Sequence, residues 1–192
     1  GQYRGFTVPA MNIRGITYDT ARAAFRAAIK NKVGPFIFEI ARSEIGYTLQ
    51  SPAEYAGCVL AAALAEGYRG PVFIQGDHFQ LNRKNFAADS KKEIDLVHSL
   101  IKESVQAGFY NIDIDASTLV NIEKADLLEQ QAANGLITAE MTQYIRSIEP
   151  QGITISVGGE IGEIGAGNST VGDLRAFMEK YRQALSKGAK GI

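Results

Sequence analysis

The stretch FIQGDHFQ (73–80) is an apolar run that ends on an acid and a histidine, Asp77 and His78. A neutral imidazole is a good ligand for zinc-like metals, and a neighbouring carboxylate can act as a general acid or base. We expect both residues in the loop after a strand, where adjacent side chains can converge on one ligand. The structural alternative is that Asp77 caps the turn and His78 is an ordinary loop histidine.

A second candidate group lies in the glycine-rich stretch VGGEIGEIG (157–165), where Glu160 follows a predicted strand. Glycines allow the backbone to approach a ligand closely and to adopt unusual dihedral angles. We expect Glu160 on the same rim as His78, as a second metal ligand. A catalytic zinc normally takes three protein ligands, so a third would come from beyond Ile192 or from another chain. A glycine-rich turn with solvated glutamates is the structural alternative.

A third group is the stretch IDIDAS (112–117). Strand alternation predicts Asp113 and Asp115 on one face and the isoleucines on the other. Acids inside a parallel sheet are costly unless they are paired, so we expect Asp115 and Ser117 at the rim. Asp113 is expected to form an internal salt bridge and has no predicted catalytic role. His98 lies in the middle of a predicted helix and is interpreted as a surface or helix-packing residue.

Five short apolar segments have the character of strands that are covered on both faces. They span residues 6–13, 35–40, 71–74, 110–114 and 153–157. Between and after them, apolar residues recur at helical spacing over 21–29, 53–66, 93–106, 138–148 and 171–185. Alternating strands and helices predict right-handed crossovers and a parallel sheet.

Two α/β architectures have this alternation, a doubly wound sheet and a (β/α)₈ TIM barrel. The first strand is not followed by Gly-x-Gly-x-x-Gly, which weakens the dinucleotide-binding version of the first. Polar residues just after several strands favour the barrel, because its C-terminal strand ends face one shared site. These residues are Asn12, Ser43, Glu44, Asp77, His78, Asp115, Ser117 and Glu160.

A barrel needs eight strands and about 250 residues, whereas this chain of 192 residues has five predicted strands. We therefore expect residues 1–192 to be a single domain that forms the N-terminal portion of a (β/α)₈ barrel in a longer polypeptide, supplying about its first five β/α units. A complete, smaller open-sheet protein is the alternative.

The composition is that of an ordinary globular protein. Twenty basic residues against 21 acidic ones give a net charge of -1, which does not suggest nucleic acid or an anionic membrane as a partner. Cys58 is the single cysteine, so we expect a reducing, cytoplasmic location. No apolar stretch approaches the roughly 18–20 residues of a membrane span.

Four motifs together resemble the class II (metal-dependent) fructose-bisphosphate aldolase family. The family's His-x-Asp-His signature is matched by QGDH (75–78), and its Glu-x-Glu-aliphatic-Gly signature by GGEIG (158–162). A strand ending in Ile-Asp-x-Ser is matched by IDAS (114–117), and Pro-Ala-aromatic-Asn by PAMN (9–12), with Met11 at the aromatic position. All four occur in the family's order, each at a predicted strand end, so the resemblance spans the chain.

The resemblance implies a (β/α)₈ lyase of carbohydrate metabolism and glycolysis. Its reaction is the reversible cleavage of a ketose bisphosphate, similar to fructose 1,6-bisphosphate, into dihydroxyacetone phosphate and an aldehyde phosphate. His78 and Glu160 would bind a divalent metal, zinc in most members, and Asp77 would move the proton on the C4 oxygen. The residues that would line the substrate are Asn12, Ser43, Asp115 and Ser117. We also expect a homo-oligomer.

The chain departs from the family pattern in both main signatures, and Gly167-Asn168 stands where the family usually has an acidic residue. Gln75 stands where the first signature histidine is expected, and Gly158 stands where the first glutamate is expected. The glycine before Asp77 also resembles the accessory subunit of tagatose-bisphosphate aldolases. A non-catalytic barrel subunit that supports such an enzyme is therefore the alternative function.

Overall fold

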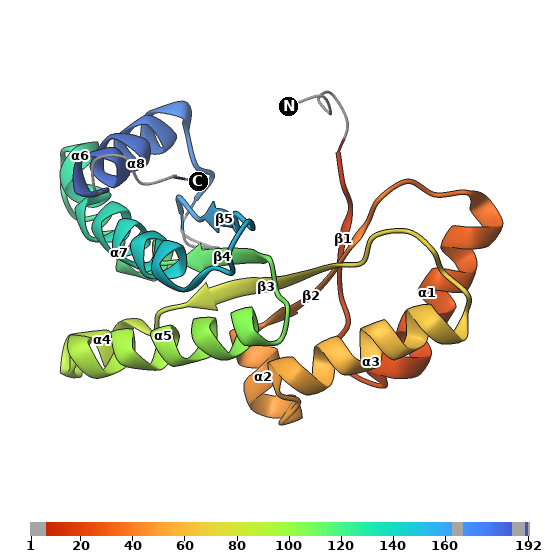
Figure 1. Ribbon diagram of the computed structural model, residues 1–192. Helices are drawn as coiled ribbons and strands as arrows, with labels where there is room; N and C mark the ends of the chain where they lie inside the picture. The colour runs from red at the N-terminus through yellow and green to blue at the C-terminus, as the bar shows by residue number, and fades with distance from the viewer. Residues whose placement is uncertain (1–6, 163–166, 186–190, 192) are drawn as a thin grey trace.

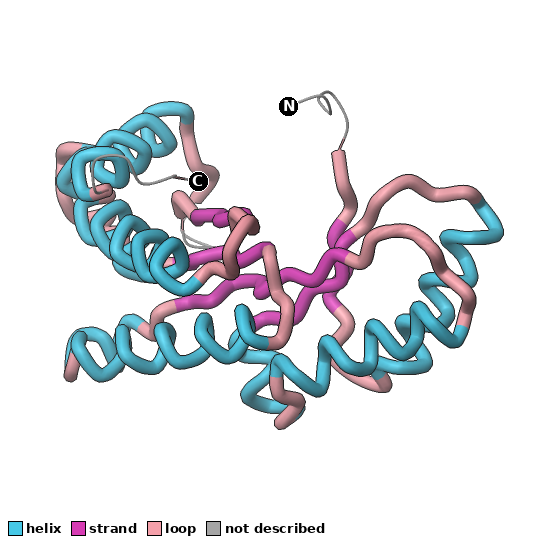
Figure 2. The backbone as a smooth tube through the Cα atoms, viewed as in Figure 1, coloured by secondary structure: helices cyan, strands magenta, loops and turns pink. Residues whose placement is uncertain are grey.

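The computed structural model describes residues 7–162, 167–185 and 191 of the chain. They form an α/β fold in which the strands of one parallel sheet alternate with helices (Figures 1 and 2). The strands are β1 (Ala10–Asn12), β2 (Ile37–Ala41), β3 (Phe73–Gln80), β4 (Asn111–Asp115) and β5 (Ser156–Gly159). The longer helices are α1 (Thr17–Asn31), α3 (Pro52–Ala65), α5 (Ser90–Gln106), α7 (Ala132–Ile148) and α8 (Val171–Ala184).

The strand order in the sheet is the order in the chain, β1-β2-β3-β4-β5, and every neighbouring pair is parallel. A doubly wound sheet requires a reversal of strand order, and the described strands contain none. Because successive right-handed crossovers run in the same direction, the helices between the strands lie on one side of the curved sheet (Figure 1). The opposite side of the sheet is left without helices (Figure 2).

The core lies between the sheet and these helices, in two clusters. The first joins α1, β2 and α3, with Phe25, Phe38 and Val59 among its fully buried side chains. The second joins β3, β4, β5, α5 and α7, and includes Phe79 and Ile114. In both clusters, alternate residues of each strand are buried against the helices. The residues that alternate with these buried ones along the strand project to the open face.

The five predicted strands and five predicted helices are confirmed in type and order, whereas several boundaries differ. The expected strand 71–74 is β3, which continues through FIQGDHFQ to Gln80, and the first strand is shorter than expected. Short helical segments were missed by the sequence pattern because they are too short to show a period. They are α2 (Arg42–Thr48), α4 (Arg83–Ala88), η1 (Ser117–Leu119) and α6 (Leu127–Gln130).

Helix ends follow local chemistry. The Ser51 hydroxyl accepts a hydrogen bond from the backbone N–H of Glu54 at 3.2 Å, and Pro52 occupies the first position of α3, as predicted from Ser-Pro at a helix start. The expected buried stripe of α8 is wrong at its first turn, where Val171 and Leu174 are 65% and 45% exposed. Because α8 packs on helix α7 rather than directly on the sheet, a narrower stripe around Phe177 suffices.

No helix in the described part of the chain is both long enough and apolar enough to cross a membrane.

Candidate active site

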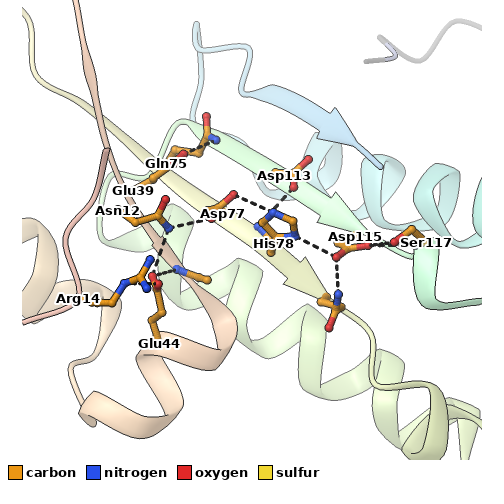
Figure 3. A network of polar contacts seen from close by, with 12 residues as sticks. Asn12, Arg14, Glu39, Glu44, Gln75, Asp77, His78, Asp113, Asp115 and Ser117 are labelled. Atoms are coloured by element: carbon orange, nitrogen blue, oxygen red, sulfur yellow. Dashed lines mark hydrogen bonds and ion pairs between the residues drawn. The ribbon is translucent and has the colours of Figure 1, made fainter. Parts of the chain in front are cut away.

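The site begins with an irregularity in β3. Against β4, Gly76 pairs with Ile112 and Phe79 pairs with Ile114, so three steps along β3 match two along β4. This is a β-bulge, in which two residues oppose one residue of the neighbouring strand. His78 adopts a left-handed backbone conformation with φ of 42°. The bulge therefore lets two consecutive residues, Asp77 and His78, lie opposite Asp113 on the open face of the sheet (Figure 3).

The expectation that Asp77 and His78 lie in a loop after the strand is wrong, because both belong to β3. Their side chains nevertheless converge, as expected, and Asp113 joins them. One ligand atom from each of Asp77, His78 and Asp113 lies within 4.8 Å of the others, so the three could hold a metal ion. His78 Nε2 lies 3.7 Å from Asp77 Oδ1, and the His78 backbone N–H donates to Asp113 Oδ2 at 3.3 Å.

His78 is oriented from behind by Asp115. Asp115 Oδ2 lies 3.1 Å from His78 Nδ1 and accepts a 2.6 Å hydrogen bond from Gln80 Nε2. Asp115 Oδ1 accepts from the backbone N–H and the hydroxyl of Ser117, at 3.0 and 2.6 Å. Since an ionised carboxylate only accepts hydrogen bonds, the proton of a neutral His78 ring lies on Nδ1. The lone pair of Nε2 is then left on the side of Asp77, as a metal ligand requires.

The rim position expected for Asp115 and Ser117 is wrong. Both side chains are buried, and Asp115 is only 1% exposed. The Asp115 carboxylate can be buried because hydrogen-bond donors of three residues surround it and offset its loss of hydration. In this arrangement the two residues support His78.

Asn12, at the end of β1, connects Asp77 to helix α2. Its side-chain N–H₂ donates to Asp77 Oδ2 at 2.8 Å and to Glu44 Oε2 at 3.3 Å (Figure 3). Ser43 lies in the first turn of α2, directly after β2, and not in a loop. Strand β1 and helix α2 thus bring these side chains to the same edge of the sheet as Asp77.

A cavity of about 550 Å³ opens at this edge. Four of the predicted site residues line it, namely Asn12, Ser43, Asp77 and His78. Its other lining residues are Arg14, Ala41, Arg42, Glu44, Gln80, Asn82 and Asn85. Asp115, Ser117 and Glu160 do not line this cavity. Asp115 and Ser117 support His78, whereas Glu160, the predicted second metal ligand, is not part of the group of Asp77, His78 and Asp113.

Glu160 follows β5 on the far side of Asp113. Its backbone carbonyl accepts a 2.8 Å hydrogen bond from the buried amide of Asn134, and the side chain of Gln131 donates to the carbonyl of Ile161 at 2.8 Å. These two buried amides hold the turn after β5 in place. Residues 163–165 of the predicted glycine-rich motif lie outside the described residues.

Gly158 makes room for Asp113. The two residues are paired across β4 and β5, and a Cβ atom at position 158 would lie 2.6 Å from Asp113 Oδ1. The glycine that departs from the family signature is therefore matched to a carboxylate on the neighbouring strand.

The open face concentrates negative charge. Burial, with the charge of Glu160 next, raises the pKa of Asp113 to about 7. Burial also raises the pKa of Glu160, and Asp115 and Asp77 add to that rise. Burial opposes the charging of His78, but its hydrogen bond to Asp115 and the charges of Asp77, Asp115 and Glu160 outweigh burial and raise its pKa. Carboxylates that repel one another in this way favour binding of a cation.

Sequence reasoning missed Asp113 and Glu39. Glu39 pairs with Gln75 across β2 and β3, and Gln75 Nε2 donates to Glu39 Oε2 at 2.9 Å. Burial, followed by the charge of Asp77, raises the pKa of Glu39 to about 7. Both acids carry the same sequence signal, a charged residue inside an otherwise apolar strand, as in PFIFEI (35–40) and YNIDI (110–114). His98 stacks on Tyr144 at 4.0 Å between ring centroids, which confirms its packing role.

Comparison with known proteins adds a family and a fold. The sequence model of the family described as fructose-bisphosphate aldolase class-II matches residues 2–187. Among solved structures, the chain is similar to a probable tagatose 6 phosphate kinase from Sinorhizobium meliloti 1021, with 17% identity and a TM-score of 0.62. That similarity covers 93% of this chain and 45% of the other, so this chain spans less than half the length of that protein. No curated protein matches the chain.

Proposed function

The chain belongs to the class II fructose-bisphosphate aldolase family, and from that membership we propose that the protein is a metal-dependent aldolase. Its reaction would be the reversible cleavage of a ketose bisphosphate, similar to fructose 1,6-bisphosphate, into dihydroxyacetone phosphate and an aldehyde phosphate. The observation that carries this proposal is the convergence of Asp77, His78 and Asp113 at the bulge of β3.

We place the five β/α units in a (β/α)₈ barrel. Strands that follow one another in chain order, with the helices on one side, are the arrangement that a barrel requires. The open face of the sheet would then be the barrel interior, and the edge that carries Asn12, Asp77 and His78 would be its C-terminal end. Active sites of TIM barrels lie at that end.

The residues present fit a divalent metal, for which we propose zinc. His78 and Asp113 offer the nitrogen and oxygen ligands that zinc binds, and Asp77 lies beside them, free to transfer a proton. The free ring nitrogen of His78 is turned towards Asp77. Glu160 adds a further carboxylate whose raised pKa reflects burial among like charges. When bound, the metal would polarise the ketone oxygen and offset the negative charge that develops there.

Asp77 is the proposed proton-transfer group. In the cleavage direction its carboxylate takes the proton of the C4 hydroxyl, the O–H electron pair forms the new carbonyl, and the C3–C4 electron pair moves onto the ketone fragment. Carbon C3 of that fragment then takes a proton from solvent, and Asp77 releases its own. In the condensation direction Asp77 returns the proton. The hydrogen bond from Asn12 to Asp77 Oδ2 fixes the carboxylate at the cavity wall, where a general base can reach a substrate hydroxyl.

The test is ketose-bisphosphate cleavage by the full-length protein. Asp77→Asn keeps the size of the side chain and its acceptor for Asn12, and we expect kcat to fall by about 10²–10⁴-fold. Exhaustive chelation should abolish activity, and added Zn²⁺ should restore it. Glu103→Gln is the matched control, because it also removes one carboxylate charge, at an exposed position of α5 away from the cavity. Full activity after Asp77→Asn or after chelation would refute the proposal.

The alternative is a non-catalytic barrel subunit that supports a tagatose-bisphosphate aldolase. One observation favours it. Gln75 stands at the position of a family histidine, and its side-chain amide donates a hydrogen bond to Glu39 instead of offering an imidazole to a metal. A protein of this kind would be inactive alone but would raise the activity of a co-purified partner. Metal-dependent cleavage by the purified protein without a partner would exclude it.

A further inference from the structure

The cavity beside Asp77 carries two arginines for which the proposed reaction has no role. Arg14 follows β1, and Arg42 begins α2 directly after β2. Both line the cavity of about 550 Å³. Strand β1 and helix α2 therefore bring two permanent positive charges to a site whose inner wall is acidic.

Arg14 is anchored by the buried carboxylate of Glu44. Arg14 Nε lies 2.8 Å from Glu44 Oε1. Glu44, which is 5% exposed, is itself fixed, because its Oε2 accepts from the Ala41 backbone N–H at 2.9 Å and from Asn12 (Figure 3). Among the described residues, the polar contacts of the Arg14 guanidinium use only Nε. Its two terminal nitrogens keep their donors for a ligand.

Arg42 is anchored in the same manner by Glu93. Arg42 Nη1 donates to Glu93 Oε1 and to the Gln80 carbonyl, each at 2.5 Å. Glu93 is 1% exposed and also accepts from the Asn82 backbone N–H and the Asn85 amide. Burial alone would raise the pKa of Glu93, but the hydrogen bonds from Arg42 and Asn82 outweigh burial and lower it. Within the described part of the chain, Arg42 Nε and Nη2 remain unused.

Each guanidinium is thus held through one nitrogen by a buried acid, and the rest of its fork of donors remains for the cavity. A fixed fork matches two oxygens of a phosphate group and loses little side-chain entropy on binding. We propose that Arg14 and Arg42 form the subsite that binds a phosphate ester group of the ketose substrate. This inference rests on the proposed function and assigns the end of the cavity at which the phosphate lies.

Size and charge support a sugar phosphate in this position. A volume of about 550 Å³ lies within the roughly 300–1,000 Å³ typical of small-molecule sites. The carboxylate of Asp77 at the inner wall repels a phosphate dianion, which places the dianion at the arginine end and the reacting carbons near Asp77. Asn85 and Ser43 offer further polar groups on the cavity wall.

Two variants test the subsite in the full-length protein. Arg14→Gln removes a guanidinium whose side chain is 60% exposed, so the fold should tolerate it. Arg42→Lys keeps a positive charge opposite Glu93 but removes the fork. Arg26→Gln is the control with an equal loss of charge outside the cavity. Circular dichroism and thermal melting establish that each variant is folded.

Two readouts separate this inference from the proposed function. In titration calorimetry with inorganic phosphate, we expect about 10-fold or greater weakening of Kd in each cavity variant and no change in the control. In cleavage assays, the ratio of kcat/KM for a phosphorylated ketose to that for the unphosphorylated ketose should fall by a similar factor.

An unchanged Kd for phosphate and an unchanged ratio in Arg14→Gln would overturn the subsite, even where Asp77-dependent cleavage stands. Conversely, no cleavage by the wild-type protein, together with weakened phosphate binding in the two cavity variants, would refute the aldolase proposal and leave the anion site. If Arg42→Lys does not fold, Arg14→Gln alone decides the result.

Discussion

The two faces of the sheet differ in chemistry, although the same strands form both: one face is apolar and the other is acidic. In β4, Ile112 and Ile114 enter the helix-covered core, whereas Asp113 and Asp115 project to the open face. On the covered face, burial of apolar area provides the stability. On the open face, the carboxylates incur a cost that only hydrogen bonds or a ligand can offset. The difference indicates that the open face is maintained for binding rather than for folding.

Within the open face, the two aspartates of β4 also differ. Asp115 receives hydrogen bonds from donors of three residues and serves as the support for His78. Among the described residues, Asp113 receives one hydrogen bond, from the His78 backbone, and burial raises its pKa to about 7. A carboxylate with so few partners, beside Asp77 and Glu160, is suited to a cation.

The largest effect should come from the covered face. Ile114 is fully buried, and Ile114→Ala removes apolar contacts and leaves a cavity, which should lower the free energy of unfolding by about 2–5 kcal/mol. Urea unfolding followed by circular dichroism measures this change. Asp113→Asn is the partner on the opposite face and should not lower stability. Equal destabilisation by both variants would contradict the inference that the covered face provides stability and the open face does not.

A smaller effect should follow from loss of the support behind His78. Asp115→Asn replaces an all-acceptor carboxylate by an amide whose N–H₂ faces the donors of Gln80 and Ser117. The orientation of His78 should loosen, and Zn²⁺ affinity should fall by about 10–100-fold. Competition with a chromogenic chelator measures the affinity. Ser117→Ala is the control, because the Ser117 backbone N–H still donates to Asp115. Unchanged affinity in Asp115→Asn would remove the supporting role.

The sequence was sufficient for the order of elements but not for the geometry of β3. Apolar runs and caps such as Ser51-Pro52 locate strands and helix starts because each depends on a few neighbouring residues. The bulge at Asp77 and His78 depends on pairing with β4, and one extra residue changes which face later side chains reach. Because the predicted strand ended before Asp77, the prediction placed Asp77 and His78 in a loop.

The environments of Asp113 and Asp115 were also predicted wrongly, because they depend on tertiary contacts. Asp115 was expected at the rim because an acid inside a sheet is costly, yet Gln80 and Ser117 provide its donors. Asp113 was expected in a salt bridge, but among the described residues its carboxylate accepts a hydrogen bond from the His78 backbone, and Gly158 leaves room for it. Neither pairing can be inferred from alternation along one strand, since both depend on which residues the neighbouring strands place alongside.

The last effect concerns Glu39, the acid that β2 contributes to the open face. Burial and Asp77 raise the pKa of Glu39 from 4.5 to about 7. An acid with a raised pKa binds its proton more tightly in the folded state, so stability falls as pH rises from about 4.5 to about 7 and then levels off. Glu39→Gln cannot titrate and can still accept the hydrogen bond from Gln75.

The variant should therefore match the wild type near pH 4 and be more stable than the wild type above pH 7. Urea unfolding of chelator-treated protein across this range measures the difference between the two proteins. Glu103→Gln, at an exposed position of α5, controls for the loss of one negative charge. A constant difference between Glu39→Gln and the wild type from pH 4 to pH 8 would show that Glu39 titrates normally. Acids with a raised pKa would then be found on the open face beside His78, as Asp113 and Glu160 are. Glu39 would be an ordinary structural residue of β2.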